Sequence, residues 1–381
     1  MKTLLHTCKS AAATAFVMAA VASCGDNHDC NPTADSNFSF EPSVEASAVV
    51  PPGTITTANI RNFRVSAFNS SNPHDLIMRN IEVVRKGLNS WTYSPSIDWP
   101  DYPIDFEAVT PSSVEIASFG SWNWGYPSTV DFDTNQEGKT DFCIAVARHI
   151  HQTEGRIRLN FRHAMARIDI LLGADIPDAT LMVKKIDLFN VCRRSTFLFP
   201  KESTYPQNQT GQLDGCWADW TQSNANDTIA FFISNEPLGT PVDTSVTSIG
   251  NQDNIFYIPY TFTPLIENNG YITGSGIRIL CKTISDDTGK QIWPNENTPY
   301  QLVPSQWGGK WAYIFFPLAD SDKPADSDRN KWRPGYHYNY RIHIHHEGTL
   351  PPSPNQKPAP AAARSSGSVS NSLEVIIHPY P

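Results

Sequence analysis

Short stretches in which apolar and polar residues alternate occur along most of the chain, and turn-forming residues separate them. The clearest is 157–161, where Ile157, Leu159 and Phe161 alternate with arginine and asparagine. Successive side chains of a β-strand point to opposite faces, so this period of two predicts strands buried on one face. The 30 prolines and the 11% aromatic content also fit many short strands and loops. We therefore expect an all-β protein.

The strand pattern continues on both sides of a polar run at residues 152–155. Further strands are expected at 60–68, 81–84, 91–93, 166–172, 181–189, 228–233, 255–260, 276–284, 311–316 and 336–344. Such spacing, with turns between the strands, is typical of β-sandwiches. We place a domain boundary in the polar run, which gives an N-terminal β-sandwich domain at 55–153 and a C-terminal one at 154–348. A boundary near Pro200 is the alternative.

The charge balance and the absence of catalytic motifs exclude several functions. With 29 basic and 38 acidic residues the net charge is −9, which disfavours nucleic acid as a partner. The sequence lacks Gly-x-Ser-x-Gly, the P-loop pattern and Gly-x-Gly-x-x-Gly, and His346-Glu347 has Leu350 where a zinc protease has its second histidine. We therefore expect no enzyme, no cofactor and no metal. His343 and His345 share a strand face, which a metal site or a plain histidine-rich strand end would explain.

The N-terminus has the pattern of a secretion signal. Lys2 and Lys9 flank the start, and the apolar run at 11–22 is too short for the roughly 20 residues of a membrane-spanning helix. The run ends in Val-Ala-Ser before Cys24, which resembles the lipobox of bacterial lipoproteins. We therefore expect a signal peptide at 1–23 and lipidation of Cys24, which would anchor the chain to the outer membrane. The alternative is ordinary secretion, in which Cys24 follows the signal peptide by chance and is not lipidated.

The next segment, 24–54, contains five acidic residues and neither lysine nor arginine. We expect a solvated acidic tether that buries no core. Acidic residues after the lipidated cysteine also resemble the surface-export signals of Bacteroidetes lipoproteins. A plain flexible spacer is compatible with that interpretation.

The C-terminus combines a linker with an isolated strand. Residues 349–371 are rich in proline, alanine and serine, which predicts an extended or flexible spacer. In the strand-like end at 372–381, Leu373, Val375 and Ile377 would share one face. Such a strand either folds back onto its own domain or pairs with another molecule.

Four segments together resemble the fimbrillin family, the type V pilins and Mfa-like lipoproteins of Bacteroidetes. They are the Trp-Pro and Ile-x-Phe-x-Ala-x-x-Pro elements of 99–111, the Leu-x-Phe-x-His-x-Met-Ala-x-Ile element of 159–168, the apolar 256–259, and the Pro-Gly-x-x-Tyr-x-Tyr strand of 332–340. The chain departs from the family at Tyr260, where the family has glutamine. The order and spacing of these segments, spread over most of 55–345, carry the resemblance.

The resemblance implies two transthyretin-like β-sandwich domains with Greek-key-type topology and a role as a fimbrial subunit or accessory adhesin. In the family, an arginine-specific protease removes the first strand, and a strand from another subunit fills the groove. Arg61 is the first basic residue after Cys24 and Arg64 is the next, so both are candidate cleavage sites or plain exposed strand arginines. Residues 372–378 would be the donor strand, and other fimbrial subunits would be the partners.

His163 lies between Phe161 and Met165 in an apolar segment. A hydrogen-bonded core histidine is therefore the expectation at this position.

The ten tryptophans suggest a second kind of function. Trp122 and Trp124, and likewise Trp217 and Trp220, lie in turn-like surroundings and could form a sugar-stacking surface. The chain would then be a glycan-binding surface lipoprotein that never polymerises, with host or microbial glycans or proteins as ligands. Packing in the core and in interfaces is the competing explanation for these tryptophans.

Overall fold

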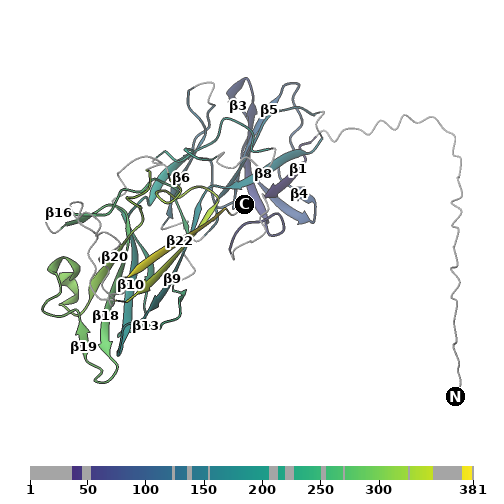
Figure 1. Ribbon diagram of the computed structural model, residues 1–381. Coiled ribbons are helices and arrows are strands. Elements are labelled where there is room, and N and C mark those ends of the chain that lie inside the picture. Colours follow the sequence, from purple (N-terminus) through teal and green to yellow (C-terminus); the bar gives the residue numbers. More distant parts are fainter. Residues whose placement is uncertain are drawn as a thin grey trace, which may run out of the picture. The chain divides into compact units, whose positions relative to one another are not determined.

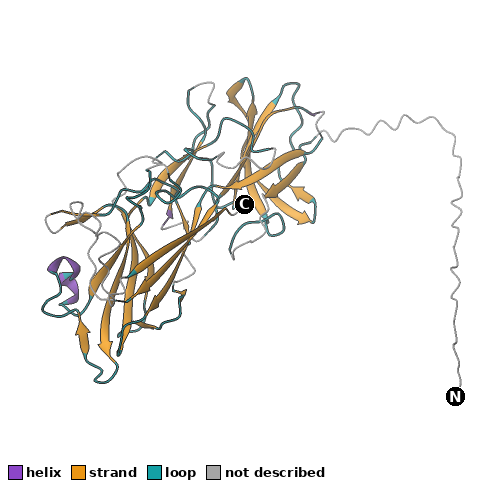
Figure 2. Ribbon diagram, in the orientation of Figure 1, coloured by secondary structure: helices purple, strands orange, loops and turns teal. Residues whose placement is uncertain are grey.

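A computed structural model gives the architecture of the chain, and Figure 2 shows strands as its dominant secondary structure. The all-β class expected from the sequence is confirmed. The residues that the structure describes are 37–44, 53–121, 125–134, 140–152, 155–205, 213–218, 227–249, 255–268, 271–324, 327–345 and 371–379.

Most of the strands are short, as the turn-rich sequence predicts, but β3 (Asn72–Gly87) has 16 residues and β10 (Ala179–Val191) has 13. In chain order they are β1 (Phe40–Val44), β2 (Asn62–Asn69), β3 (Asn72–Gly87), β4 (Ser90–Thr92), β5 (Ile104–Thr110), β6 (Thr129–Asp133), β7 (Cys143–Ile150), β8 (Ile157–His163), β9 (Ala166–Ala174), β10 (Ala179–Val191), β11 (Arg194–Leu198), β12 (Asp227–Ile233), β13 (Thr240–Val242), β14 (Thr247–Ser248), β15 (Phe256–Tyr257), β16 (Ile266–Asn268), β17 (Tyr271–Thr273), β18 (Gly276–Ser285), β19 (Gln291–Trp293), β20 (Ala312–Pro317), β21 (Tyr336–Ile344) and β22 (Ser372–Pro379). The single-turn 3₁₀ helices η3 (Tyr300–Leu302) and η4 (Ser305–Trp307) lie between β19 and β20.

The first sheet curls around its own core. Its strand order is β1-β8-β7-β5-β2-β3-β4, so three strands separate β1 from β2 along the sheet. The rings of Phe40 in β1 and Phe63 in β2 nevertheless lie only 5.8 Å apart. Contact between strands so far apart in the order requires strong curvature, which the natural twist of sheets favours. Figure 1 shows β1 beside β8 at the border of this sheet.

The opposite face of the same sheet is also buried in its middle. Along β5, Phe106 and Ala108 belong to the first core, whereas Val109 belongs to the larger core of the rest of the chain. Glu107 lies between Phe106 and Ala108 in the sequence, and its buried carboxylate accepts a hydrogen bond from Arg148 at 2.7 Å. Burial raises the pKa of Glu107, although the charge of Arg148 acts against that rise. The two cores therefore meet across this sheet.

The position of β8 corrects the expected domain boundary. β8 pairs in antiparallel fashion with β7 and in parallel fashion with β1, so it belongs to the first sheet. The expected boundary after residue 153 therefore falls between two neighbouring strands of one sheet. A boundary after residue 153 would cut this sheet, whereas a boundary after His163 leaves it whole.

Most of the remaining strands form a sandwich around the larger core. One sheet has the order β12-β10-β18-β19, with β13 on β10 and β20 on β18, and the other has the order β14-β9-β21-β22, with β15 on β9. Their facing apolar side chains include Ile277 and Ile279 of β18, Ile170 of β9, and Tyr340 and Ile342 of β21. Tyr338 and Tyr340 are buried on the same face, as the spacing of the tyrosines predicts.

Two smaller sheets complete the described residues. β6 pairs with β11, and β16 pairs with β17 as a hairpin. No helix in the described part of the chain has the length and apolar character that a membrane span requires.

Candidate strand-exchange site

The first strand of the chain is an edge strand with a deeply buried face. Among the described strands β1 pairs only with β8, from Phe40 opposite Ile157 to Val44 opposite Phe161. Phe38, Phe40 and Val44 are buried, and Phe40 is only 4% exposed. The prediction that 24–54 buries no core is therefore wrong for 37–44.

Aromatic contacts anchor β1 in the first core. The Phe38 ring lies 4.8 Å from the Trp99 ring and 5.3 Å from the Phe106 ring, both edge to face. The Phe40 ring contacts the rings of Phe63, at 5.8 Å, and Phe106, at 6.1 Å. Each fully buried apolar side chain contributes about 1.5–3 kcal/mol, and an aromatic pair adds about 0.5–1.5 kcal/mol. β1 is therefore held by its side chains more than by its single row of backbone hydrogen bonds.

Arg61 and Arg64 lie in different environments. Arg64 is in the middle of β2, paired with β3 on one side and β5 on the other. Its guanidinium donates to the carbonyl of Ser112 at 2.6 Å and forms an ion pair with Glu115 at 3.1 Å. Arg61 precedes β2 and its side chain is exposed. A protease cuts accessible backbone, and Arg61, outside the strand, is more accessible than Arg64, although the Arg61 carbonyl accepts a hydrogen bond from the Arg85 N–H at 2.9 Å.

The segment between β1 and β2 is fastened to the sheet at a buried polar cluster. The backbone N–H of Ile55 donates to Asp141 Oδ2 at 2.9 Å, and the same oxygen lies 2.7 Å from Nδ1 of the fully buried His163. Cys143 Sγ is 3.2 Å from that nitrogen. Burial raises the pKa of Cys143 far above its ordinary value, with the charge of Asp141 adding to the rise, so the thiol stays neutral.

The same cluster has a composition that could bind a metal. The donor atoms of Asp141, Cys143 and His163 lie within 4.8 Å of one another. Metal bonds of about 2 Å at a tetrahedral centre would place two ligand atoms about 3.3 Å apart, which is wider than the 2.7 Å between Asp141 and His163. The arrangement is that of a hydrogen bond, and His163 is the buried, hydrogen-bonded core histidine that the sequence predicts.

The last strand is an edge strand as well, and it pairs within its own chain. β22 runs antiparallel to β21 from Ser372 to Pro379, so the strand folds back onto its own domain in this structure. Leu373, Val375 and Ile377 share one face, as predicted, and are partly buried against the larger core. Arg329 donates to the carbonyl of Val375 at 3.2 Å.

Trp217 is not available for sugar stacking, so that prediction is wrong. It is 1% exposed, and its indole N–H donates to the carbonyl of Ala164 at 2.8 Å. Its ring packs 5.2 Å from Phe197. A large aromatic residue with its polar atom satisfied in this way belongs to the core.

Several predicted site residues are outside the described part of the chain. They are Cys24, Trp122, Trp124 and Trp220. The prediction of lipidation at Cys24 and that of sugar stacking at the three tryptophans therefore remain predictions.

Comparison with known proteins identifies the family. The model of the fimbrillin-like family matches residues 49–355, which is most of the chain, so the chain belongs to this family. A search of curated proteins by sequence finds no match.

One solved structure supports the fold, and two others are similar over most of the chain. A fimbrial protein from Bacteroides vulgatus is 12% identical over 91% of this chain and 100% of that one, with a TM-score of 0.50, which shows a shared fold. A fimbrilin from Porphyromonas gingivalis is 10% identical over 91% of this chain and 98% of that one, with a TM-score of 0.45. A C-terminally truncated tip fimbrial protein from Porphyromonas gingivalis is 14% identical over 84% and 94% of the two chains, with a TM-score of 0.35.

Proposed function

We propose that this chain is a fimbrial subunit or accessory adhesin of the bacterial cell surface, and that it assembles by strand exchange after cleavage at Arg61. The observation that carries the proposal is the placement of β1. It is an edge strand, and Phe40 and Val44 of β1 and Phe38 just before it are buried in the first core. The exposed Arg61 lies between this segment and β2. The precursor would be lipidated at Cys24 and reach the outer membrane before the cut.

Cleavage after Arg61 would convert β1 from a fixed part of the sheet into a separable peptide. Its loss would uncover the rings of Phe63 and Phe106 and the unpaired edge of β8. An apolar groove beside an open strand edge is the arrangement that accepts a strand from another molecule. The partners would be other fimbrial subunits, of this or another kind.

β22 is the proposed donor. Its apolar side chains at Leu373, Val375 and Ile377 repeat every second position, as do the buried side chains of β1. In cis they are only partly buried, so a deeper groove would bury more apolar surface. Residues 346–370 would span about 80 Å when fully extended, enough to reach a neighbouring molecule.

The test is an immunoblot of material sheared from cells that produce the full-length protein, run with and without boiling. A ladder that collapses on boiling, made of subunits that begin after Arg61, is the expected result. Arg61→Ala should abolish the ladder and leave an acylated precursor, whereas the matched Arg64→Ala should not prevent cleavage. A single acylated band from the unaltered protein would contradict polymerisation.

A second pair of variants tests the donor strand. Val375→Asp should abolish the ladder, because a charge on the buried face of β22 cannot enter an apolar groove. Glu374→Gln, on the exposed face of the same strand, should leave it intact. Circular dichroism of the purified Val375→Asp chain shows whether the monomer remains folded. A normal ladder from Val375→Asp would contradict the donor assignment.

A further inference from the structure

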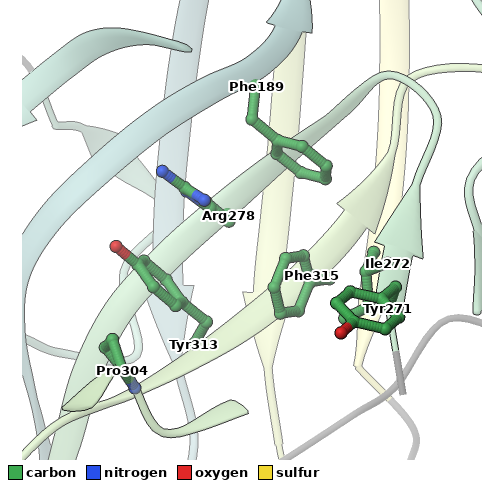
Figure 3. A pocket seen from close by; sticks show the side chains of 7 residues that line it. All are labelled: Phe189, Tyr271, Ile272, Arg278, Pro304, Tyr313 and Phe315. Atoms are coloured by element: carbon green, nitrogen blue, oxygen red, sulfur yellow. The ribbon is translucent and has the colours of Figure 1, made fainter. Parts of the chain in front are cut away.

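An aromatic pocket with a cationic side chain lies on the outer face of the β10–β18–β20 sheet. Its volume is about 220 Å³, and its lining is Phe189, Tyr271, Ile272, Arg278, Pro304, Tyr313 and Phe315. Figure 3 shows Arg278 between the rings of Phe189 and Tyr313, with Phe315, Ile272 and Tyr271 along the opposite side. Pockets for drug-sized ligands measure about 300–1,000 Å³, so this pocket suits a single ring with its substituents.

The strand register explains why these side chains meet. Arg278 of β18 lies opposite Asp187 of β10 and Phe315 of β20. Phe189 lies opposite Gly276, where a Cβ atom would come within 2.6 Å of the Phe189 ring. Glycine at this position therefore lets the ring lie across β18 and form one wall of the pocket.

The hairpin that carries Tyr271 is fastened beside that wall. The Asn190 side chain donates to the carbonyl of Gly274 at 2.6 Å. Gly274 has φ +94°, and a Cβ there would collide with the backbone of Pro264. These constraints hold β17 near Phe189 while Tyr271 stays 76% exposed, so its ring face is open to solvent.

The charges at the pocket do not balance. The buried carboxylate of Asp187 lies 2.7 Å from Lys185 Nζ and 3.1 Å from Arg278 Nε. In the described part of the chain no other acidic side chain forms an ion pair with either cation, so one positive charge is left over. Arg278 reaches this carboxylate through Nε, and its guanidinium lies over the Tyr313 ring at 4.7 Å. Its planar fork suits a carboxylate ligand.

Tyr313 adds a hydroxyl group to the same wall. Its burial raises its pKa, with the charge of Arg278 acting in the opposite direction, so the side chain stays a neutral hydroxyl at physiological pH. A neutral hydroxyl can donate a hydrogen bond to a ligand as well as accept one.

The geometry points to a binding site for an anionic saccharide, a terminal uronic- or sialic-acid residue, on this face of the protein. The pyranose ring would stack on Tyr271 and Phe315, and its carboxylate would pair with Arg278. Flat aromatic faces and a single unbalanced cation favour such a sugar over a neutral one. A role of this site in contacting a receptor rests on the proposed function as an adhesin. The binding of the sugar itself does not require polymerisation.

The test is calorimetric titration of the purified full-length monomer with sialyllactose, with a glucuronate disaccharide and with lactose. Binding of at least one acidic sugar, at least tenfold tighter than that of lactose, is expected. Tyr271→Ala should weaken it about tenfold, and Arg278→Gln should remove the preference for the acidic sugar. Tyr300→Ala is the matched control, because Tyr300 is 75% exposed and does not line the pocket.

Three results would overturn the site: no binding of either acidic sugar, equal binding of lactose, or Tyr271→Ala binding as the control does. Circular dichroism of each variant separates lost binding from lost folding, and the exposed position of Tyr271 keeps its variant informative. The ladder on cells should be unchanged by Tyr271→Ala. If the unaltered protein binds the sugar but gives no ladder, only the strand-exchange proposal is contradicted. If it gives a ladder but binds no acidic sugar, only the proposed sugar site is contradicted.

Discussion

Ile55 and Asp141, 86 residues apart in the sequence, are joined by a hydrogen bond of 2.9 Å from the backbone N–H of Ile55 to the Asp141 carboxylate. Ile55 lies on the segment that cleavage after Arg61 would release, whereas Asp141 remains with the sheet. The same carboxylate contacts His163 inside the protein. This one side chain therefore fastens the releasable segment to the part of the protein that would stay behind.

Asp141→Ala should lower the free energy of unfolding by about 2–4 kcal/mol, because it removes the acceptor of the Ile55 N–H and the carboxylate beside His163. Asp141→Asn should cost less, since its amide oxygen can still accept from Ile55. Urea titration measures both changes, and limited digestion with trypsin should cut faster after Arg61 in Asp141→Ala. The exposed Asp131→Ala is the control and should change stability by about 0.5 kcal/mol or less. Equal effects of the two alanine variants would contradict a fastening role for Asp141.

The anchoring of β1 predicts a substitution whose cost disappears with cleavage. Phe40→Ala should destabilise the uncut chain by about 3–5 kcal/mol, because it leaves a cavity between the Phe63 and Phe106 rings. Once the chain is cut after Arg61 and freed of β1 it no longer contains residue 40, so the altered and unaltered precursors should give products of equal stability. The control is Glu41→Ala, since that side chain lies on the exposed face of β1.

Chemical denaturation of the uncut chain, unaltered and with each change, gives three values, and the cut chain freed of β1 gives the reference common to all of them. If Phe40→Ala were as harmless as Glu41→Ala in the uncut chain, β1 would not be the core strand described above.

Features that depend on local side-chain alternation could be predicted from the sequence. The period of two at 157–161 identified β8, and the spacing of Tyr338 and Tyr340 placed both on one buried face. The apolar neighbours of His163 likewise indicated a core position. In these cases the pattern itself contains the information, because a strand assigns alternate residues to opposite faces.

Features that depend on long-range pairing could not be predicted. Strand β1 was missed because the acidic composition of 24–54, averaged over the segment, hides the alternation of Phe38, Phe40 and Val44. Whether the polar run at 152–155 links two domains or two strands of a hairpin depends on which strands pair. The turn-like sequence around Trp217 does not reveal that its ring packs between Phe132 and Phe197. Sequence patterns could therefore propose β22 as a donor, but they could not identify the edge of β8 that we propose as the acceptor.

The pair formed by Asp169 and His337 predicts how stability changes in acid. His337 Nε2 lies 2.7 Å from Asp169 Oδ2, between β21 and its parallel neighbour β9. Burial alone would raise the pKa of Asp169, but the hydrogen bond with His337 and the charge of Arg167 outweigh it and hold the pKa below its usual value. A carboxyl group with a lowered pKa stabilises the fold above its unfolded pKa of about 3.9. That contribution is lost as the pH falls through the lower, folded value.

Asp169→Asn should therefore lower the free energy of unfolding by about 1–2 kcal/mol at pH 7, and by at least as much at pH 5.5. Near pH 2 the difference from the unaltered chain should shrink, because Asp169 itself becomes protonated there. Urea titrations at the three pH values check the trend, and the exposed Asp287→Asn provides the matched control. A difference at pH 2 as large as that at pH 7 would show that the substitution acts through packing. Charge on Asp169 would then contribute nothing to holding β9 beside β21.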